Sequence, residues 1–382
     1  MTNSVLSHII YLLRPTKSIK GLRQNIQVLE SKRSNGGESV SIRIPELFKS
    51  ILAGAKSPAI NQFYDAIKQR RHSRMSNILG LSEAMSQKLL QIDIPVVAAT
   101  LFPHATEYQL EVFIDYVYWL LIFDDRMDDG EFKCDIIGAT NEILETLAVL
   151  DDDHPTVTAE ENPLRHVFQD IWKRFSMNVS KEQRHRYKRG NRAYMMGLVK
   201  QIQWTGCGCG YATLDQYRET RRGTVAIYPL LPFCEWQHST NLPEDVIDHP
   251  SIEALGDILS DIAWLWNDIC SIKKDMETGE ESNVIIMRMR EGESMQKAMD
   301  TVAGLLDDCY ENWEKQIGAV PKWGEDIDKD ISTVVQAYLD LVVGLVSWDI
   351  STPRYMGKDA ATVRQTNAMK FSKSLLESYE KS

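Results

Sequence analysis

Helical periodicity of the apolar residues constrains the fold of this 382-residue chain more than any other feature. Apolar residues recur every three or four positions through a dozen segments, whereas the alternation typical of a β-strand occurs only over residues 39–44. The expected helices, with ends placed to within about four residues, cover residues 58–75, 82–91, 107–125, 135–150, 163–178, 181–204, 213–223, 251–275, 281–290, 293–317, 329–349 and 361–380. The sequence therefore predicts an all-α protein.

The loops between these segments are too short and too ordinary in composition to be linkers between domains. No internal repeat at the spacing of a solenoid is present in the sequence. We therefore expect one helical domain over residues 51–382, preceded by a variable leader over residues 1–50.

Charge and hydropathy argue against nucleic-acid and membrane proteins. The 43 Lys and Arg residues are outnumbered by 54 Asp and Glu residues, and a net charge of -11 does not suit a protein that neutralises phosphates over a broad surface. The two longest apolar runs, residues 108–123 and 334–348, are interrupted by Asp115 and Asp340. This pattern predicts buried helices rather than membrane spans.

The six cysteines are sparse and lack the regular spacing of a secreted disulfide scaffold. Cys207 and Cys209 flank a glycine, but no second Cys or His pair stands at the spacing of a zinc site, which favours ordinary thiols. The apolar stretch at residues 9–13 is too short for a signal peptide. We expect a reducing, cytoplasmic environment.

An acidic cluster ends the expected helix 107–125, where residues 123–129 read Phe-Asp-Asp-Arg-Met-Asp-Asp. Asp124 and Asp128 are four positions apart, so on a helix they lie one turn apart and can reach the same metal cluster. Oxygen ligands of this kind suit Mg²⁺ or Mn²⁺. Taken alone, the cluster is more typical of a solvated helix end, so a second group of ligands is needed.

A second group of oxygen donors occurs in the expected helix 251–275. Asn267, Ser271 and Asp275 are spaced i, i+4 and i+8, so they drift around the helix by about 80°, span about 12 Å and form one polar stripe. Residues 258–266 before them are mostly apolar, which predicts a buried helix. A polar helix face is the alternative, but buried polar groups need partners and a metal ion supplies them.

These two motifs resemble those of the class I terpene synthases of microbial, especially fungal, type. The first metal motif of that family, Asp-Asp-x-x-Asp, matches residues 124–128. Its second motif, Asn-Asp-x-x-Ser-x-x-Lys-Glu, matches residues 267–275, with Asp in place of the final Glu. The replacement keeps the charge but shortens the reach of the carboxylate by one methylene.

Two further elements strengthen the resemblance. The family has a diphosphate-sensing Arg 46 positions before the Asn of the second motif, and Arg221 stands at that position. Its C-terminal Arg-Tyr pair, preceded by Trp, matches Arg354, Tyr355 and Trp348. The four elements follow the family order over about residues 100–356, and their joint occurrence is far more specific than any one of them.

The resemblance implies a single-domain class I terpenoid synthase bundle with a central apolar cavity. It also implies three Mg²⁺ ions, with Mn²⁺ as a substitute, and an isoprenyl diphosphate substrate. The metal ligands that it implies are Asp124, Asn267, Ser271 and Asp275, assisted through a metal-bound water by Asp128. The residues that it implies for diphosphate binding are Arg221, Lys274, Arg354 and Tyr355.

Departure of the diphosphate leaves a carbocation, which needs a dry cavity with aromatic faces that stabilise positive charge. The residues expected to line this cavity are Phe113, Val117, Leu121, Trp264 and Trp348. Each of them is equally typical of an ordinary helical core. In the turn after the sensing Arg the family often has a helix-breaking Gly; Val225 stands here, and its backbone carbonyl would fill the same role.

Rival functions lack their own motifs. A prenyl-elongating synthase needs a second aspartate-rich motif, and a protonation-initiated class II cyclase needs Asp-x-Asp-Asp, which residues 151–153 do not supply. A catalytically silent helical scaffold would need neither group of oxygen ligands. We therefore expect a sesquiterpene cyclase acting on farnesyl diphosphate, with geranyl or geranylgeranyl diphosphate as the alternative. Homodimers are common among such enzymes, so a second copy of the chain is a candidate partner.

Overall fold

The computed structural model describes residues 38–56, 58–128, 130–205, 210–211 and 213–380, and the side chains of residues 55, 56, 128, 353, 354, 357 and 380 are outside this description. Its elements are β1 (Ser39–Arg43), η1 (Ser50–Lys56), α3 (Tyr64–Ile78), α4 (Glu83–Ile92), α5 (Ile94–Leu101), α6 (Glu107–Asp128), α7 (Ile136–Ala148), α8 (Pro163–Ser176), α9 (Lys181–Thr205), α10 (Leu214–Thr224), η2 (Tyr228–Leu230), α11 (Leu231–Gln237), α12 (Glu244–Ile247), α13 (Pro250–Thr278), α14 (Val284–Arg290), α15 (Met295–Ala319), α16 (Glu325–Asp349), α17 (Pro353–Met356), η3 (Gly357–Asp359), α18 (Ala360–Thr366), β2 (Ala368–Ser372) and α19 (Lys373–Glu380). The predicted all-α class is confirmed.

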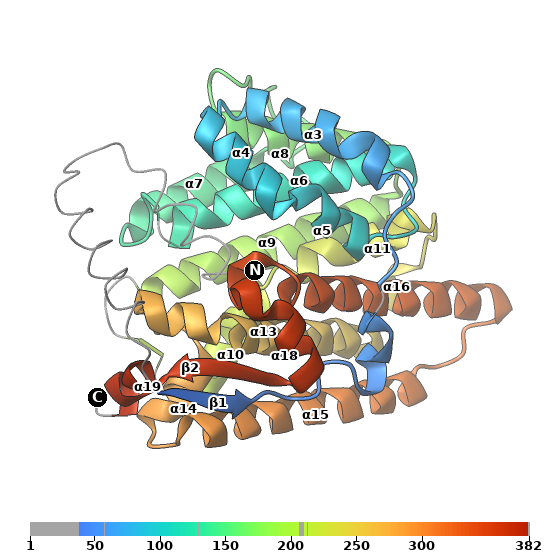
Figure 1. Cartoon of the computed structure of the whole chain (residues 1–382). Coiled ribbons are helices and arrows are strands. Elements are labelled where there is room, and N and C mark those ends of the chain that lie inside the picture. The colour runs from blue at the N-terminus through green and yellow to red at the C-terminus, as the bar shows by residue number, and fades with distance from the viewer. Residues whose placement is uncertain (1–37, 57, 129, 206–209, 212, 381–382) are drawn as a thin grey trace.

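Two long helices, α6 and α13, form the centre of the bundle (Figure 1). Every residue from Val112 to Leu121 on α6 and from Ile258 to Ile272 on α13 is buried, which is the pattern of a helix covered on all sides. Helix α6 packs against α3, α5, α8 and α9, and α13 packs against α10, α14, α15 and α16. Helix α9 lies between these two halves of the molecule.

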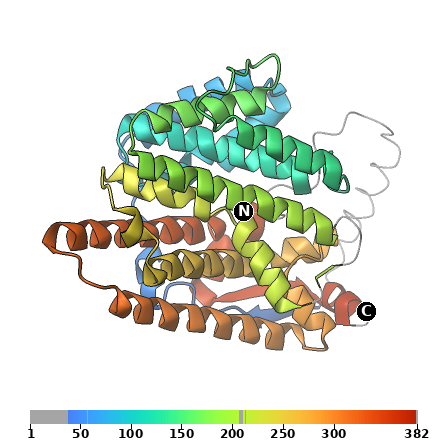
Figure 2. The same cartoon turned by 180° about the vertical axis from the view of Figure 1, so that it is seen from behind.

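Local signals fix where these helices begin and end. Thr106 and Gln109 cap the start of α6 reciprocally, because each accepts a hydrogen bond from the backbone N–H of the other, at 3.4 and 2.8 Å. Helix α13 ends at Thr278 and is followed by Gly279, whose φ of 73° lies in the left-handed region that glycine adopts without steric penalty. The C-terminal ends of α6 and α13 lie at the same end of the molecule in both views (Figures 1 and 2).

The strand predicted over residues 39–44 is confirmed, and it has a partner that was not predicted. Strand β1 pairs antiparallel with β2, in a register from Ser39 opposite Ser372 to Arg43 opposite Ala368. The helix predicted over residues 361–380 is therefore wrong. Helix α18 ends at Thr366, and its cap residue Asn367 has a left-handed φ of 48°. Strand β2 then runs from Ala368 to Ser372, directly before α19.

The other expected helices correspond to observed ones, but α5 and α11 were missed, as were the four-residue helices α12 and α17. Asp93 marks the boundary between α4 and α5: its φ of 55° ends α4, and its carboxylate accepts a hydrogen bond from the Val96 N–H at 3.3 Å, which caps α5. Helix α11 follows a second break at Ala226, where φ is 62°. Breaks of this kind are hard to read from periodicity, because apolar residues continue through both of them.

Both long apolar runs form packed helices. The first lies in α6, and the second lies in α16, the one described helix that is long and apolar enough to cross a membrane. Helix α16 packs against α5, α11, α13 and η1, as expected of a core helix. The division between a leader over residues 1–50 and a domain over residues 51–382 stays a prediction. Leu47 and Phe48, which belong to the expected leader, are buried in the core.

The described cysteines, Cys134, Cys234, Cys270 and Cys309, are free thiols. Cys207 and Cys209, considered above as metal ligands, lie outside the described residues.

Candidate active site

Asp124, the first predicted metal ligand, lies in the last turns of α6 and is 2% exposed. Tyr194 on α9 donates a hydrogen bond from its hydroxyl to Asp124 Oδ1 at 2.9 Å. Arg126 instead bonds Glu131 and Glu142, at 2.8 and 2.9 Å. Asp124 is therefore a buried carboxylate held from the neighbouring helix, whereas the side chain of Asp128 lies outside the described part of the structure.

The three predicted ligands on α13 are all buried. Ser271 donates a hydrogen bond from Oγ to Asp275 Oδ2 at 2.5 Å, so these side chains, one turn apart, are in direct contact. Asp275 Oδ1 is buried and accepts no hydrogen bond from any described residue. Burial raises the pKa of Asp275 to about 6, against the opposing effect of the positive charge on Lys274. Lys274, a predicted diphosphate-binding residue, is itself buried.

Arg221, on the neighbouring helix α10, reaches the start of the α13 stripe. Its Nη2 donates to Asn267 Oδ1 at 2.9 Å and to Asp268 Oδ1 at 2.8 Å. Asn267 in turn donates from Nδ2 to the Tyr355 hydroxyl at 3.2 Å. The structure therefore brings together Arg221, Asn267 and Tyr355, which are far apart in the sequence and come from three different motifs.

The rest of the C-terminal motif lies beside this group. The Trp348 ring packs edge-on against Tyr355, with 6.3 Å between the ring centroids. Trp348 is 5% exposed, so it faces the interior. The side chain of Arg354 is outside the described residues.

Asp268, which anchors Arg221, was not among the predicted site residues. Asp268 is 1% exposed and accepts hydrogen bonds at Oδ2 from the Tyr217 hydroxyl at 2.6 Å and from the Val284 N–H at 2.9 Å. Burial raises the pKa of Asp268, whereas the positive charge of Arg221 lowers it. Asp268 stands inside the second metal motif, so its position was a usable signal, but its partners depend on tertiary packing.

The chain breaks its helical course directly after α10. Val225 is the C-terminal cap residue of α10, and its N–H donates to the Arg221 carbonyl at 2.9 Å. The next residue, Ala226, has a φ of 62°, which is strained by roughly 1–2 kcal/mol for a residue with a Cβ atom. The helix break expected at this turn is present, although no glycine makes it.

The residues expected to line the cavity are buried within the packed helices. The Phe113 ring lies 4.2 Å from Phe102 and 4.7 Å from Phe233, measured between centroids. Trp264 donates from Nε1 to Asp261 at 2.9 Å, and its ring packs edge-on against Tyr217. Val117 and Leu121 are buried on α6. Their part in lining a cavity stays a prediction.

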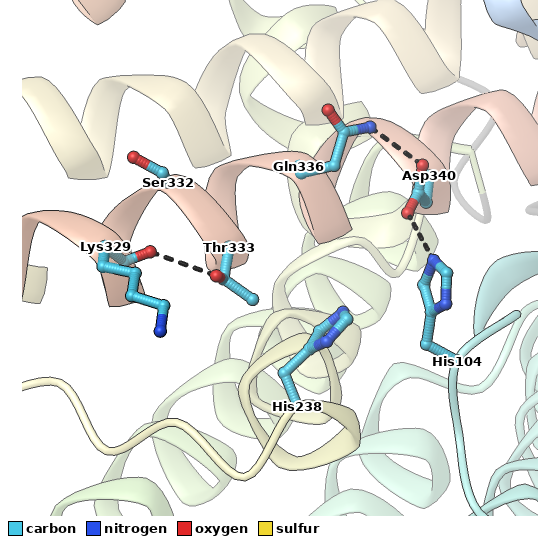
Figure 3. A pocket seen from close by; sticks show the side chains of 7 residues that line it. All are labelled: His104, His238, Lys329, Ser332, Thr333, Gln336 and Asp340. Atoms are coloured by element: carbon cyan, nitrogen blue, oxygen red, sulfur yellow. Dashed lines mark hydrogen bonds and ion pairs between the residues drawn. The ribbon is translucent and has the colours of Figure 1, made fainter.

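Two surface cavities lie apart from these residues. The first has a volume of about 350 Å³ and is lined by residues of α16 together with His104 and His238. Figure 3 shows that Asp340 of α16 interacts with His104 and accepts a hydrogen bond from Gln336, at 3.0 Å. The second, of about 330 Å³, is lined by Ile122 and Leu164 among others. No predicted site residue lines either cavity.

The donor set suits a hard divalent cation, which prefers oxygen ligands. Helix α6 offers the buried carboxylate of Asp124, and α13 offers that of Asp275. Helix α13 adds the amide oxygen of Asn267 and the hydroxyl oxygen of Ser271. The buried Asp275 Oδ1 without a hydrogen-bond partner is an oxygen that a cation would satisfy. No three His, Cys, Asp or Glu side chains gather at one point among the described residues, so amide, hydroxyl and substrate oxygens would complete the coordination.

Comparison with known proteins independently indicates a metal-binding protein. Residues 115–312 match the family model described as terpene synthase family 2, C-terminal metal binding. The chain is 34% identical to terpene cyclase 4 of Gibberella fujikuroi, over 86% of this chain and 90% of that protein. It is 31% identical to the (+)-eremophilene synthase of the same organism, over 86% and 92%.

The fold agrees as well. The crystal structure of a-eudesmol synthase superimposes with a TM-score of 0.69 at 20% identity, covering 77% of this chain and 97% of that one. Since the family match spans more than half of the chain and includes Asp124 and all of α13, the chain belongs to the terpene synthase family and is a metal-dependent class I terpene cyclase.

Proposed function

We propose that this cyclase ionises farnesyl diphosphate with three Mg²⁺ ions and closes the carbocation into a cyclic sesquiterpene hydrocarbon or alcohol, releasing diphosphate. The observation that carries the proposal is the contact of Arg221 with Asn267, at 2.9 Å, and of Asn267 with Tyr355, at 3.2 Å. A predicted metal ligand thus lies between two predicted diphosphate-binding residues. Such a group can hold a metal ion and a phosphate oxygen side by side.

In this proposal the metal ligands are Asp124, Asn267, Ser271 and Asp275, with Asp128 assisting through water. Bound Mg²⁺ supplies a Lewis acid that stabilises the charge developing on the leaving diphosphate. The carboxylates of Asp124 and Asp275 are buried, so bulk water screens their attraction to the cation less than it would at the surface.

Cationic and hydroxyl donors of the chain complete the diphosphate site. Arg221 is 2% exposed, and its Nε is buried without a hydrogen-bond partner among the described residues. That N–H is available for a phosphate oxygen, which a guanidinium binds well. Lys274, Arg354 and Tyr355 would add further donors from α13 and the C-terminal region.

The hydrocarbon part of the substrate needs an environment without nucleophiles. Phe113, Val117, Leu121, Trp264 and Trp348 are all buried and carry no group that would attack a carbocation readily. The aromatic faces among them can stabilise positive charge. The turn at Val225 would place a backbone carbonyl near the ionising carbon.

Farnesyl diphosphate is proposed because single-domain chains with these motifs most often resemble sesquiterpene cyclases. Geranyl and geranylgeranyl diphosphate are the alternatives, and a chain-elongating prenyltransferase is a weaker one. The proposed setting is the cytoplasm, in agreement with the free thiols of the described cysteines. A homodimer stays a prediction.

The test is incubation of the purified protein with each of the three diphosphates and Mg²⁺, followed by mass spectrometry of the volatile products. Asp124→Ala and Asn267→Ala should abolish turnover while leaving the helical circular dichroism intact. Asp152→Ala and Asn241→Ala, at exposed loop positions, are the matched controls and should stay active. Near-normal turnover by either site variant would contradict the proposal.

A further inference from the structure

Asn283 immediately precedes α14 and is completely buried, with 0% of its surface exposed. Its Oδ1 accepts a hydrogen bond from the Ile285 N–H at 2.9 Å, which makes it the N-terminal cap of this helix. The amide nitrogen, which capping does not use, points back at α13. One side chain therefore joins the start of α14 to the helix that carries three of the predicted metal ligands.

The Asn283 amide has two N–H groups, and both find acceptors on α13. Nδ2 donates to the Asp268 carbonyl at 2.8 Å and to Asp275 Oδ2 at 3.0 Å, and it lies 3.4 Å from Ser271 Oγ. The first bond holds the turn between α13 and α14 against the backbone of α13. The second bond acts directly on a proposed metal ligand.

The two carboxylate oxygens of Asp275 differ in their hydrogen bonds. Oδ2 accepts from Ser271 at 2.5 Å and from Asn283 at 3.0 Å. Oδ1 is buried and accepts from none of the described residues. The carboxylate is thus held by one oxygen, while the other is left available for a cation.

We infer that Asn283 is a positioning residue for metal binding: its amide fixes the orientation of Asp275 and Ser271 so that their free oxygen lone pairs face the cation. The inference rests on the proposed function, since it assumes that these residues are ligands. It gives a role to a residue outside both metal motifs. Side chains that orient metal ligands typically change metal affinity by about 10–100-fold when they are replaced.

The orientation of the carboxylate matters especially at Asp275, because the Glu that the family usually has at this position is one methylene longer. A shorter carboxylate has fewer ways to reach a metal ion, so its usefulness depends more strongly on how it is oriented. Two donors on one oxygen provide that orientation here.

The test uses two substitutions that keep an acceptor for the cap of α14. Asn283→Asp retains the side-chain oxygen but replaces the donor that faces Asp275 with another acceptor. Asn283→Ser retains a capping hydroxyl but removes both amide N–H groups, and it adds no charge. The matched control is Asn162→Asp, because Asn162 caps α8 by accepting from the Arg165 N–H at 3.1 Å, and α8 packs against α6.

The first readout is the rise in melting temperature as Mg²⁺ is titrated in the presence of inorganic diphosphate and without substrate. Both Asn283 variants should need about 10–100-fold more Mg²⁺ for half of the full rise, whereas Asn162→Asp should respond like the wild type. The second readout is turnover, where saturating Mg²⁺ should restore most of kcat. A role limited to capping would lower the melting temperature without changing the Mg²⁺ requirement.

An unchanged Mg²⁺ requirement in either folded Asn283 variant would overturn the inference. Failure of the wild type to respond to Mg²⁺ and diphosphate would instead overturn the proposed function, so the two failures are distinct.

Discussion

Arg221 on α10 and Asn267 on α13 are in direct contact, with 2.9 Å between Arg221 Nη2 and Asn267 Oδ1. The same Nη2 also binds the buried carboxylate of Asp268, the residue next to Asn267. The guanidinium of Arg221, proposed to bind diphosphate, and the side-chain oxygen of Asn267, proposed to bind metal, therefore have a fixed relative position before substrate binds. Preorganised donors of this kind contribute to catalysis because they need not reorganise as charge develops.

Arg221→Lys should reduce kcat by about 100–1,000-fold, the usual effect of losing one preorganised donor to a developing negative charge. Lysine keeps the charge but lacks the planar guanidinium, whose Nη2 contacts Asn267 and Asp268 while its Nε is directed separately. The measurement is diphosphate release at saturating Mg²⁺ and substrate. Arg222→Lys is the neighbouring control, because Arg222 binds Asp261 at 2.8 and 2.6 Å instead. Equal losses in the two variants would show that the effect is merely structural.

Tyr194→Phe should raise the Mg²⁺ concentration needed for half-maximal activity by about tenfold, because the variant removes the hydroxyl that orients Asp124. The control is Tyr116→Phe, which removes a comparable buried hydrogen bond between α6 and α9, from Tyr116 to Asn191 at 2.8 Å. That control should lower stability without altering the response to Mg²⁺. The prediction fails if the two variants shift the Mg²⁺ requirement alike.

The effect of Mg²⁺ on stability should depend on pH through Asp275. Burial raises the pKa of this carboxyl from an ordinary value of about 4 to about 6 in the metal-free protein. The native state then holds the proton more tightly than the unfolded chain does, so this residue's contribution to the free energy of unfolding falls as pH rises from about 4 to about 6. Mg²⁺ binds the ionised carboxylate, so its stabilising effect should grow over the same interval.

The measurement for this pH effect is the melting temperature with and without Mg²⁺ alone, at pH 5 and pH 7. The increase caused by Mg²⁺ should be larger at pH 7, and Asp275→Asn should remove most of the difference. Equal increases at the two pH values would count against Asp275 as a ligand.

Ala226→Gly should raise the free energy of unfolding by about 0.5–1 kcal/mol, because glycine adopts the left-handed φ of 62° without a clash of Cβ. The measurement is urea denaturation of the metal-free enzyme. Ala303→Gly, inside α15, is the control and should lower stability by about 1 kcal/mol, since glycine weakens a helix interior. A destabilised Ala226→Gly variant would mean that the methyl group makes contacts worth more than the strain.

Sequence reasoning succeeded where the signal was local. The spacing of Asn267, Ser271 and Asp275 places them on one face of any helix, so their alignment followed from the sequence alone. It failed where a partner lies far along the chain. Residues 368–372 have apolar residues compatible with a helix, yet they form β2 because β1 lies beside them.

The same distinction explains the candidate site. The motif residues were found by pattern, but the residues that hold them in place were not. Tyr194 binds Asp124 from another helix, and Tyr217 and Asn283 bind Asp268 and Asp275 across turns and helix contacts. No spacing rule predicts such pairs, because they depend on how the helices pack.

The pairing of β1 with β2 matters for the design of shortened forms of this enzyme. Removal of the first 43 residues would leave β2 as an open edge, with the backbone groups that now bond β1 unpaired and Met369 and Phe371 no longer covered by β1. Open edges of this kind recruit strands from other molecules and promote aggregation. A soluble truncation should therefore start before Glu38, whose side chain also forms an ion pair with Lys373 at 2.9 Å.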